Sequence, residues 1–238
     1  MENRSRKRYY SIFSVILLLA GGGMMIYKPI MDYWISPNHL NSLYQTGLGA
    51  EGIKKNMESL DEQNQKKQVE SFDFTAVENL GFLDKKATIK TENVIGGIYI
   101  PSVDINLPIL YGATNENLRA ASATMKPDQA MGEGNYAIAA HNSRNPQLLF
   151  GALKHVEAGD ELFITNKDKV FKYTMVQSQV VMPERVDVID DVADKTLLTL
   201  VTCYSSDGSD RLIVTGELEE IVDYSEVDST IHEAFEPL

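Results

Sequence analysis

The chain from residue 94 onward alternates short apolar segments with polar turns. Each segment is three to eight residues long and rich in β-branched or aromatic side chains, which is typical of β-strands. The predicted strands are 94–101, 107–111, 136–140, 161–165, 170–177, 180–182, 197–202 and 211–218. Strands that recur about every ten residues, with few helices between them, predict a mainly β domain, either an antiparallel barrel or a sandwich.

Two short helical segments are predicted within this β region. Residues 116–121 follow Thr114, whose hydroxyl is suited to cap a helix N-terminus. Residues 148–156 are expected to form one or two helical turns.

A long uncharged stretch lies near the start of the chain. The nineteen residues 9–27 carry no charge, and at about 1.5 Å per helical residue they approach the hydrocarbon thickness of a bilayer. A cleaved signal peptide would show the same basic start and apolar core, but no Ala-x-Ala cleavage pattern follows. We therefore predict a single-pass membrane anchor at 9–27. Because basic residues precede it, residues 1–8 are expected in the cytoplasm and the rest of the chain outside the cell.

Polar segments flank the predicted β domain on both sides. Residues 28–91 are rich in Lys, Glu and Gln, with Leu and Ile at loosely helical spacing, which predicts an extracytoplasmic stalk that is either flexible or helical. The folded domain is expected at 92–220, and an acidic tail at 221–238. The formal net charge of −12 argues against nucleic acid as a partner, since phosphate binding requires a basic face.

Cys203 is the only cysteine of the chain, so it has no intramolecular disulfide partner. It directly follows the predicted strand 197–202, and Arg211 begins the next one. If the two strands form a hairpin, the thiol and the guanidinium lie side by side at one rim of the sheet. A lone thiol beside a cation is a candidate nucleophile.

A cysteine nucleophile also requires a base, because an unperturbed thiol is only a few per cent thiolate at neutral pH. Of the four histidines, His39 lies in the stalk, His232 in the acidic tail, and His155 in a charged helical turn. His141 instead follows the small-residue strand 136–140 directly. It is the candidate base, although taken alone such a histidine is more often structural, and a lone cysteine more often a core residue.

Taken together, these residues resemble the sortases. Residues 199–203 read Thr-Leu-Val-Thr-Cys and match the family's Thr-Leu-x-Thr-Cys signature. The family's Cys–His–Arg set is completed by His141 and Arg211. His141 follows a strand of small residues, and Arg211 begins the strand after the cysteine. With its predicted N-terminal anchor and no second apolar span after the domain, the chain is most similar to class A, the housekeeping sortases.

The resemblance covers about 94–220 and implies a closed eight-stranded β-barrel with short helices. It implies a cysteine transpeptidase that cleaves a Leu-Pro-x-Thr-Gly sorting signal between Thr and Gly. Cys203 would form a thioester, His141 would act as acid and base, and Arg211 would hold the substrate and its oxyanion. The acceptor would be the amine of a lipid II-type cell-wall precursor, so that surface proteins become attached to the peptidoglycan of a Gram-positive bacterium.

The resemblance also suggests how the sorting signal is bound. It points to the loop 182–196 as one wall of the groove, to Ala139 and Val201 as an apolar floor, and to Thr202 as a further substrate-binding residue.

Some class A sortases bind calcium through acidic residues between the short helix and the histidine strand, plus one on the loop before the cysteine strand. Here Lys126 and Gln129 interrupt the first of these segments, and Ca²⁺ requires several oxygen ligands. No Cys/His cluster with zinc spacing is present either. We therefore predict no metal site and no cofactor.

Two alternatives remain open at this stage. A cysteine protease or other hydrolase could use the same Cys–His pair and differ only in resolving the acyl-enzyme with water. A non-enzymatic tethered β-domain would keep its thiol as a core residue, unreactive and distant from His141.

Overall fold

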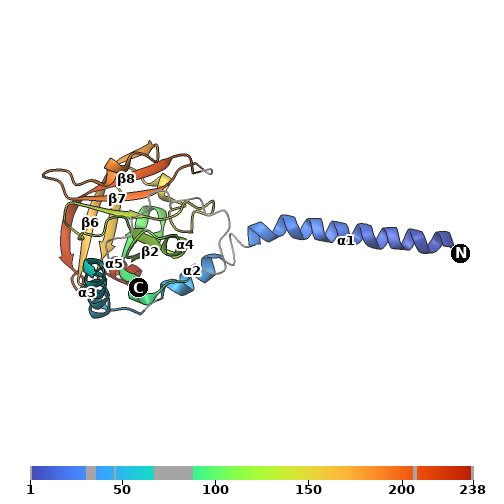
Figure 1. The fold of residues 1–238 in the computed structure, drawn as a ribbon, viewed down its shortest axis with the longest axis horizontal. Helices are drawn as coiled ribbons and strands as arrows, with labels where there is room; N and C mark the ends of the chain where they lie inside the picture. Colours follow the sequence, from blue (N-terminus) through green and yellow to red (C-terminus); the bar gives the residue numbers. More distant parts are fainter. Residues whose placement is uncertain (1, 31–35, 46, 67–87, 206–207, 237–238) are drawn as a thin grey trace.

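The computed structural model describes residues 2–30, 36–45, 47–66, 88–205 and 208–236. Within these residues, eight strands close into a barrel in the order β1-β2-β3-β4-β7-β8-β6-β5 (Figure 1). The strands are β1 (Val94–Ile100), β2 (Ile105–Leu110), β3 (Ser122–Thr124), β4 (Asn135–Ala139), β5 (Glu161–Thr165), β6 (Lys169–Val181), β7 (Leu197–Cys203) and β8 (Arg211–Asp223). The expected closed eight-stranded barrel is confirmed.

The strand pairing is mixed, so the expectation of a purely antiparallel sheet is wrong. β2 pairs with β3 in parallel, and β4 pairs with β7 in parallel. Both parallel pairs need crossover connections, and these are made by α4 (Asn115–Ala120) and by the β5–β6 hairpin respectively. The β4–β7 pair brings segments about sixty residues apart in the sequence into direct contact.

The strand boundaries differ from the prediction in three places. β3 is missing from the prediction, because three residues are too few to show a period. The predicted strands 170–177 and 180–182 are one strand, β6, whose register against β8 shifts at two places and so breaks the alternation of apolar and polar residues. β8 continues beyond 218 to Asp223 for lack of any turn signal there.

The short helical segments agree with the prediction. Thr114 caps α4, accepting a hydrogen bond from the backbone N–H of Asn117 to its hydroxyl at 3.2 Å. The turns expected within 148–156 include the 3₁₀-helix η5 (Leu153–His155).

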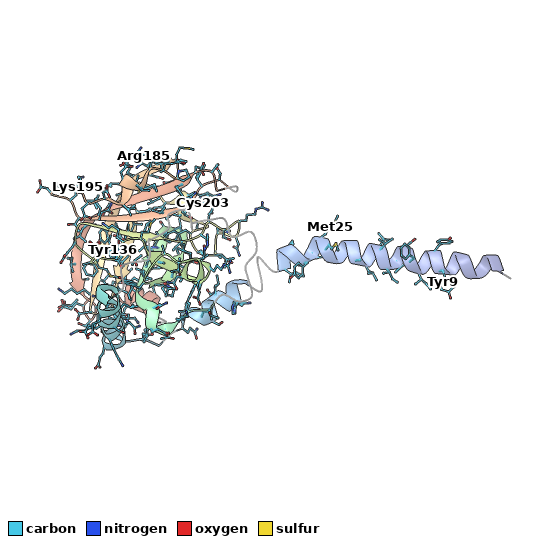
Figure 2. All side chains as sticks on the ribbon, viewed as in Figure 1. Tyr9, Met25, Tyr136, Arg185, Lys195 and Cys203 are labelled. Carbon is cyan, nitrogen blue, oxygen red and sulfur yellow. The ribbon has the colours of Figure 1, made fainter. Side chains whose placement is uncertain are left out.

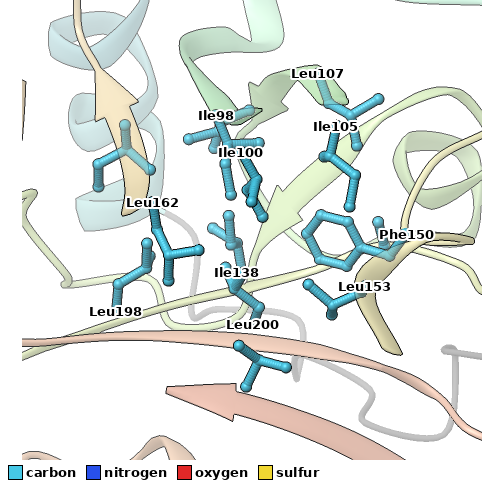
Figure 3. Close-up of a cluster of buried hydrophobic side chains, with 14 of the residues drawn as sticks. Ile98, Ile100, Ile105, Leu107, Ile138, Phe150, Leu153, Leu162, Leu198 and Leu200 are labelled. Carbon is cyan, nitrogen blue, oxygen red and sulfur yellow. The ribbon is translucent and has the colours of Figure 1, made fainter. Parts of the chain in front are cut away.

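The barrel interior is filled by large aliphatic side chains that alternate along the strands. Figure 3 shows Ile138 and Leu200 from the parallel pair facing Ile98 and Leu162 across this core. Phe150 and Leu153, from the connection after β4, pack into the same cluster. Burying each such side chain stabilises the fold by about 1.5–3 kcal/mol, so the strand ends that carry the candidate site are held rigidly.

Two helices from the predicted stalk lie against the barrel (Figure 1). They are α2 (Ser36–Tyr44) and α3 (Ala50–Lys66). Leu40 and Ile53 are buried, and the side-chain amide of Asn56 donates to the carbonyls of Thr91 and Val94 at 2.8 and 2.9 Å. The helical alternative for the stalk therefore holds for these residues; residues 67–87 lie outside the described part of the chain.

The acidic tail contains a helix that the sequence did not predict. In α5 (Ser229–Phe235), Asp228 caps the first turn by accepting from the N–H of Thr230 at 2.8 Å. Phe235 is fully buried and stacks edge-on against Tyr99 of β1. The tail thus packs against β1 of the barrel through α5.

The predicted membrane anchor is not supported. Residues 9–27 lie within one long helix, α1 (Glu2–Ile30), whose apolar side chains are exposed. Among the described residues, no helix is both long enough and apolar enough to cross a bilayer.

Candidate active site

Cys203 and Arg211 occupy the facing ends of β7 and β8. The antiparallel register pairs Cys203 directly with Arg211, as the hairpin predicts. Directly paired residues of a sheet project to the same face, so the thiol and the guanidinium are neighbours. Figure 2 labels Cys203 at this end of the barrel.

His141 reaches the same place through the parallel pairing of β4 with β7. Ala139 pairs with Val201, and the N–H of Ala140 donates to the carbonyl of Val201 at 3.2 Å. Continuing this register by two residues places His141 beside Cys203. Just past the end of β4, the side-chain amide of Asn142 donates to the carbonyl of Tyr204 at 3.4 Å, which agrees with this continuation. Cys203 therefore has Arg211 beside it on β8 and the segment that carries His141 on its other side.

All three side chains lie on the outer face of the barrel. Residues two positions earlier or later on the same strands, Ala139, Val201 and Ile213, belong with Cys203 to one buried apolar cluster. Side chains at i and i+2 share a face, which places His141 and Arg211 there too. Ala139 and Val201 thus lie beside the nucleophile on the same face, but both are buried, and their role as the floor of a groove stays a prediction.

Thr202 lies on the opposite face of β7. It pairs with Leu212, and its neighbours at alternate positions, Leu198 and Leu200, belong to the barrel interior. Its hydroxyl is buried, and no hydrogen bond to it is found among the described residues. The structure therefore does not bring the Thr202 side chain together with Cys203, and its role in substrate binding stays a prediction.

The three candidate residues are shielded from water. Cys203 is 0 % exposed, His141 4 % and Arg211 7 %. A low-dielectric site strengthens the interactions of a cation with developing negative charge. Because Cys203 has no accessible surface, a peptide carbonyl reaches its sulfur only when the covering side chains move.

Hydrogen bonds in the β7–β8 loop hold Arg211 in place. Its Nη1 donates to the carbonyls of Gly208 and Asp210 at 2.8 and 2.9 Å. The Asp210 carboxylate in turn accepts from the backbone N–H and the hydroxyl of Ser205, both at 2.7 Å. Ser205 and Asp210 were not singled out from the sequence, although polar residues that flank a glycine turn are a known signal for such loop contacts.

The loop between β6 and β7 covers the same face of the barrel. It contains the 3₁₀-helix η6 (Val186–Ile189), and Ile189 is buried in the apolar cluster of Cys203. Met182 and Val192, at the two ends of the loop, are exposed large apolar side chains. The predicted wall of the groove thus lies beside the candidate nucleophile; its contact with a sorting signal stays a prediction.

Lys126 and Gln129, which interrupt the segment where calcium binding was considered, both make hydrogen bonds in the structure. Lys126 extends its ammonium to Asp191 Oδ1 at 2.7 Å, and the N–H of Asn135 donates to the same oxygen at 2.9 Å. Gln129 is engaged with the backbone of Ala137, donating to its carbonyl and accepting from its N–H. The hydrogen bond from Lys126 lowers the pKa of Asp191. In the described part of the chain, no group of three or more Asp, Glu, His or Cys could hold a metal ion.

Comparison with known proteins gives a consistent result. The model of the sortase domain matches residues 98–219. The chain is 36 % identical to a protein named sortase A from Streptococcus agalactiae, over 98 % of this chain and 96 % of that protein. The chain belongs to the sortase family. Sortase A of Listeria monocytogenes is 31 % identical over 86 % of this chain and 90 % of its own length.

Solved structures support the same assignment. The crystal structure of sortase A from Listeria monocytogenes superimposes with a TM-score of 0.57 at 33 % identity, covering 61 % of this chain and 99 % of that one. This sortase is therefore a cysteine transpeptidase by family. Cys203, which ends the segment Thr-Leu-Val-Thr-Cys, is the only cysteine of the sequence and stays the candidate nucleophile.

Proposed function

We propose that this sortase cleaves a Leu-Pro-x-Thr-Gly sorting signal between Thr and Gly and transfers the threonyl group to the amine of a cell-wall precursor. The observation that supports the proposal is the position of Cys203 between His141 and Arg211 on one face of the barrel. That order gives the nucleophile a proton donor on one side and a fixed cation on the other.

In the first step, the Cys203 thiolate attacks the threonine carbonyl, and the carbonyl oxygen takes up the negative charge. Arg211, tethered to two backbone carbonyls, offers its remaining donors to this oxyanion. His141 gives its proton to the glycine nitrogen as the C–N bond breaks. The products are a thioester on Cys203 and a free glycine amine.

In the second step, an amine attacks the thioester. Neutral His141 accepts the proton of the attacking nitrogen, the new amide bond forms, and the C–S bond breaks to return the Cys203 thiolate. The shielding of Cys203 from solvent supports transfer to an amine rather than to water, because an acceptor held at the site competes better than solvent that is largely excluded.

The test is mass spectrometry of the full chain incubated with a sorting-signal peptide, with and without a peptide amine. We expect a thioester adduct on Cys203, slow release of free acid without amine, and amide product when amine is present. Cys203→Ala and His141→Ala should abolish both products, whereas His155→Ala, an exposed histidine away from the site, should keep them. Free acid as the sole product at saturating concentrations of several amines would identify a hydrolase instead.

We also propose that the catalytic domain works outside the cytoplasm, where surface proteins meet wall precursors. Support comes from the proposed reaction, because its two substrates, a surface protein and a wall precursor, meet outside the cytoplasm. Protease added to intact, wall-stripped cells should then degrade the catalytic domain. Full protection of the domain, with a cytoplasmic marker as the reference for intact cells, would refute this location.

A further inference from the structure

An open pocket of about 490 Å³ lies beside the barrel, and none of Cys203, His141 and Arg211 lines it. Its walls come from four segments that are distant in the sequence: α2, the start of β2, the connection after β4, and α5. Neither the signature residues nor the proposed mechanism uses it. Its size is in the range of small-molecule sites in proteins.

Side-chain amides dominate the polar part of this pocket. Asn38, Asn41, Gln45, Asn106 and Gln147 all line it. Asn38 and Asn41 lie at i and i+3 on one face of α2, and Gln45 directly follows the last residue of that helix. The other face of α2 is pinned to the barrel by Leu40, which fixes the amide face toward the pocket.

The pocket is nearly free of charge. Asp104 is the only lining residue with a formal charge, although about a quarter of the whole chain is charged. The floor is made of buried aliphatic residues that include Leu107, Pro108 and Leu149. Amides both donate and accept hydrogen bonds, and an apolar floor favours the C–H face of a ring. These features suit a neutral ligand rich in hydroxyl and amide groups.

The strand register places this pocket at the same level of the barrel as the catalytic residues. β2 pairs with β3 at Ile109 and Ser122, and the hydroxyl of Ser122 donates to the carbonyl of Pro108 at 2.7 Å. Continuing the pairings across β3, β4 and β7 aligns Pro108 with His141 and Cys203. Three strand spacings separate Pro108 from Cys203, a distance of about 15 Å along the rim. Figures 1 and 2 show α2 and Cys203 toward the same side of the barrel.

A single connection links the pocket to the active site. It begins after Ala139, the last residue of β4, includes His141, and supplies Gln147 and Leu149 to the pocket. The carbonyl of His141 accepts from the N–H of Phe150 at 3.1 Å, so the loop closes on itself. A ligand seated against Gln147 is thus held in a fixed relation to the catalytic histidine.

We propose that this pocket is a saccharide subsite, which holds a neutral, N-acetylated sugar of the acceptor while the acceptor's peptide amine reaches Cys203. The inference rests on the proposed function and names the part of the acceptor that is recognised. An extended peptide covers at most about 3.3–3.6 Å per residue, so four or five residues between sugar and amine bridge the 15 Å. An acceptor with both parts gains affinity from the second contact without any change at the thioester.

The test compares two acceptors with the full chain: a pentapeptide with a terminal amine, and the same peptide with an N-acetylated disaccharide at its other end. We expect KM for the glycopeptide to be lower by at least about fivefold, with kcat unchanged. Asn41→Ala combined with Gln147→Ala should remove this difference and leave the bare peptide unaffected. Both residues are exposed, so the fold should tolerate their loss. The control is Gln177→Ala, an exposed amide on β6 outside the pocket.

A second measurement separates this inference from the proposed function. Binding of the disaccharide alone to the full chain, followed by calorimetry, needs no transfer reaction and should disappear in the Asn41→Ala, Gln147→Ala variant. Equal KM for the two acceptors, or disaccharide binding that survives in the double variant, would overturn the saccharide subsite. A higher KM for the bare peptide in that variant would also overturn it, because the pocket would then bind the peptide. Failure of the proposed function would show as absent transfer to any amine.

Discussion

The hydrogen bonds between Ser205 and Asp210 offer a direct test of how Arg211 is positioned. Asp210→Ala removes both bonds that close the β7–β8 loop, each 2.7 Å long and made to a half-buried carboxylate. Hydrogen bonds to a charged group contribute about 1.5–3 kcal/mol where they are buried, and partial exposure reduces this. We take about 1.5–3 kcal/mol for the pair together.

That energy holds the carbonyls of Gly208 and Asp210 where Arg211 binds them. If the open loop no longer presents Arg211 to the oxyanion, Asp210→Ala lowers kcat/KM by about 10- to 100-fold. Ser205→Ala removes only the hydrogen bond from the hydroxyl and should lower kcat/KM by about 3- to 10-fold. Since one loop is affected, both variants should unfold within a few degrees of the unaltered chain.

Cleavage of a fluorescence-quenched sorting-signal peptide measures these rates, and thermal unfolding checks the fold. Asp210→Asn separates position from charge, because its amide oxygen still accepts from the N–H of Ser205. It should therefore retain more activity than Asp210→Ala. Activity of Asp210→Ala within twofold of the unaltered chain, in a folded protein, would refute the positioning argument. Equal losses for Asn and Ala would show that the charge of Asp210 matters instead.

Three further predictions concern single residues. Arg211→Lys should lose about 2–4 kcal/mol of transition-state stabilisation in kcat/KM while unfolding normally, because an ammonium lacks the planar fork of donors; near-normal turnover would show that charge alone suffices. Tyr44→Phe should raise the free energy of unfolding by about 1 kcal/mol in denaturant titrations, because the hydroxyl is buried without a hydrogen bond among the described residues; a loss of stability would refute this. Lys126→Ala should lower that free energy by about 0.5 kcal/mol at neutral pH, since Asp191 is 68 % exposed, and the difference should vanish as the pH falls through the lowered pKa of Asp191. Calcium added to chelator-treated protein should change the rate less than about twofold; strong activation would mean that carboxylates beside Lys126 bind the ion.

The sequence predicted those parts of the fold that depend on neighbouring residues. The strands that flank the β7–β8 turn are apolar and β-branched, so the pairing of Cys203 with Arg211 follows from a local hairpin. The cap at Thr114 is equally local. The irregular strand β6 and the three-residue strand β3 were missed or divided, because bulges and short length hide the period of two.

The contacts that complete the site are not local. His141 meets Cys203 only through the parallel β4–β7 pairing, which the spacing of apolar residues does not encode; the family resemblance supplied it. The α5 contact was missed because acidic residues surround the pair Ile231 and Phe235, whose i, i+4 spacing is the signal of a buried helical face. The family resemblance suggested Thr202 as a substrate-binding residue, but adjacent residues of a strand face opposite sides, so its side chain does not share a face with Cys203.

The barrel explains why so much of the site is fixed before any substrate arrives. Closure leaves no free sheet edge in the barrel, so β7 is paired with β8 from Leu197 to Cys203 and with β4 from Leu197 to Val201. The position of Cys203, at the end of β7, is therefore set relative to both neighbouring strands. Arg211 begins β8, and His141 follows the end of β4. The parts left adjustable are the loops at that rim, which carry Asp210, Ile189 and Gln147. In a fold of this kind, chemistry is set by strand register, and specificity for the signal and the acceptor is set by the loops.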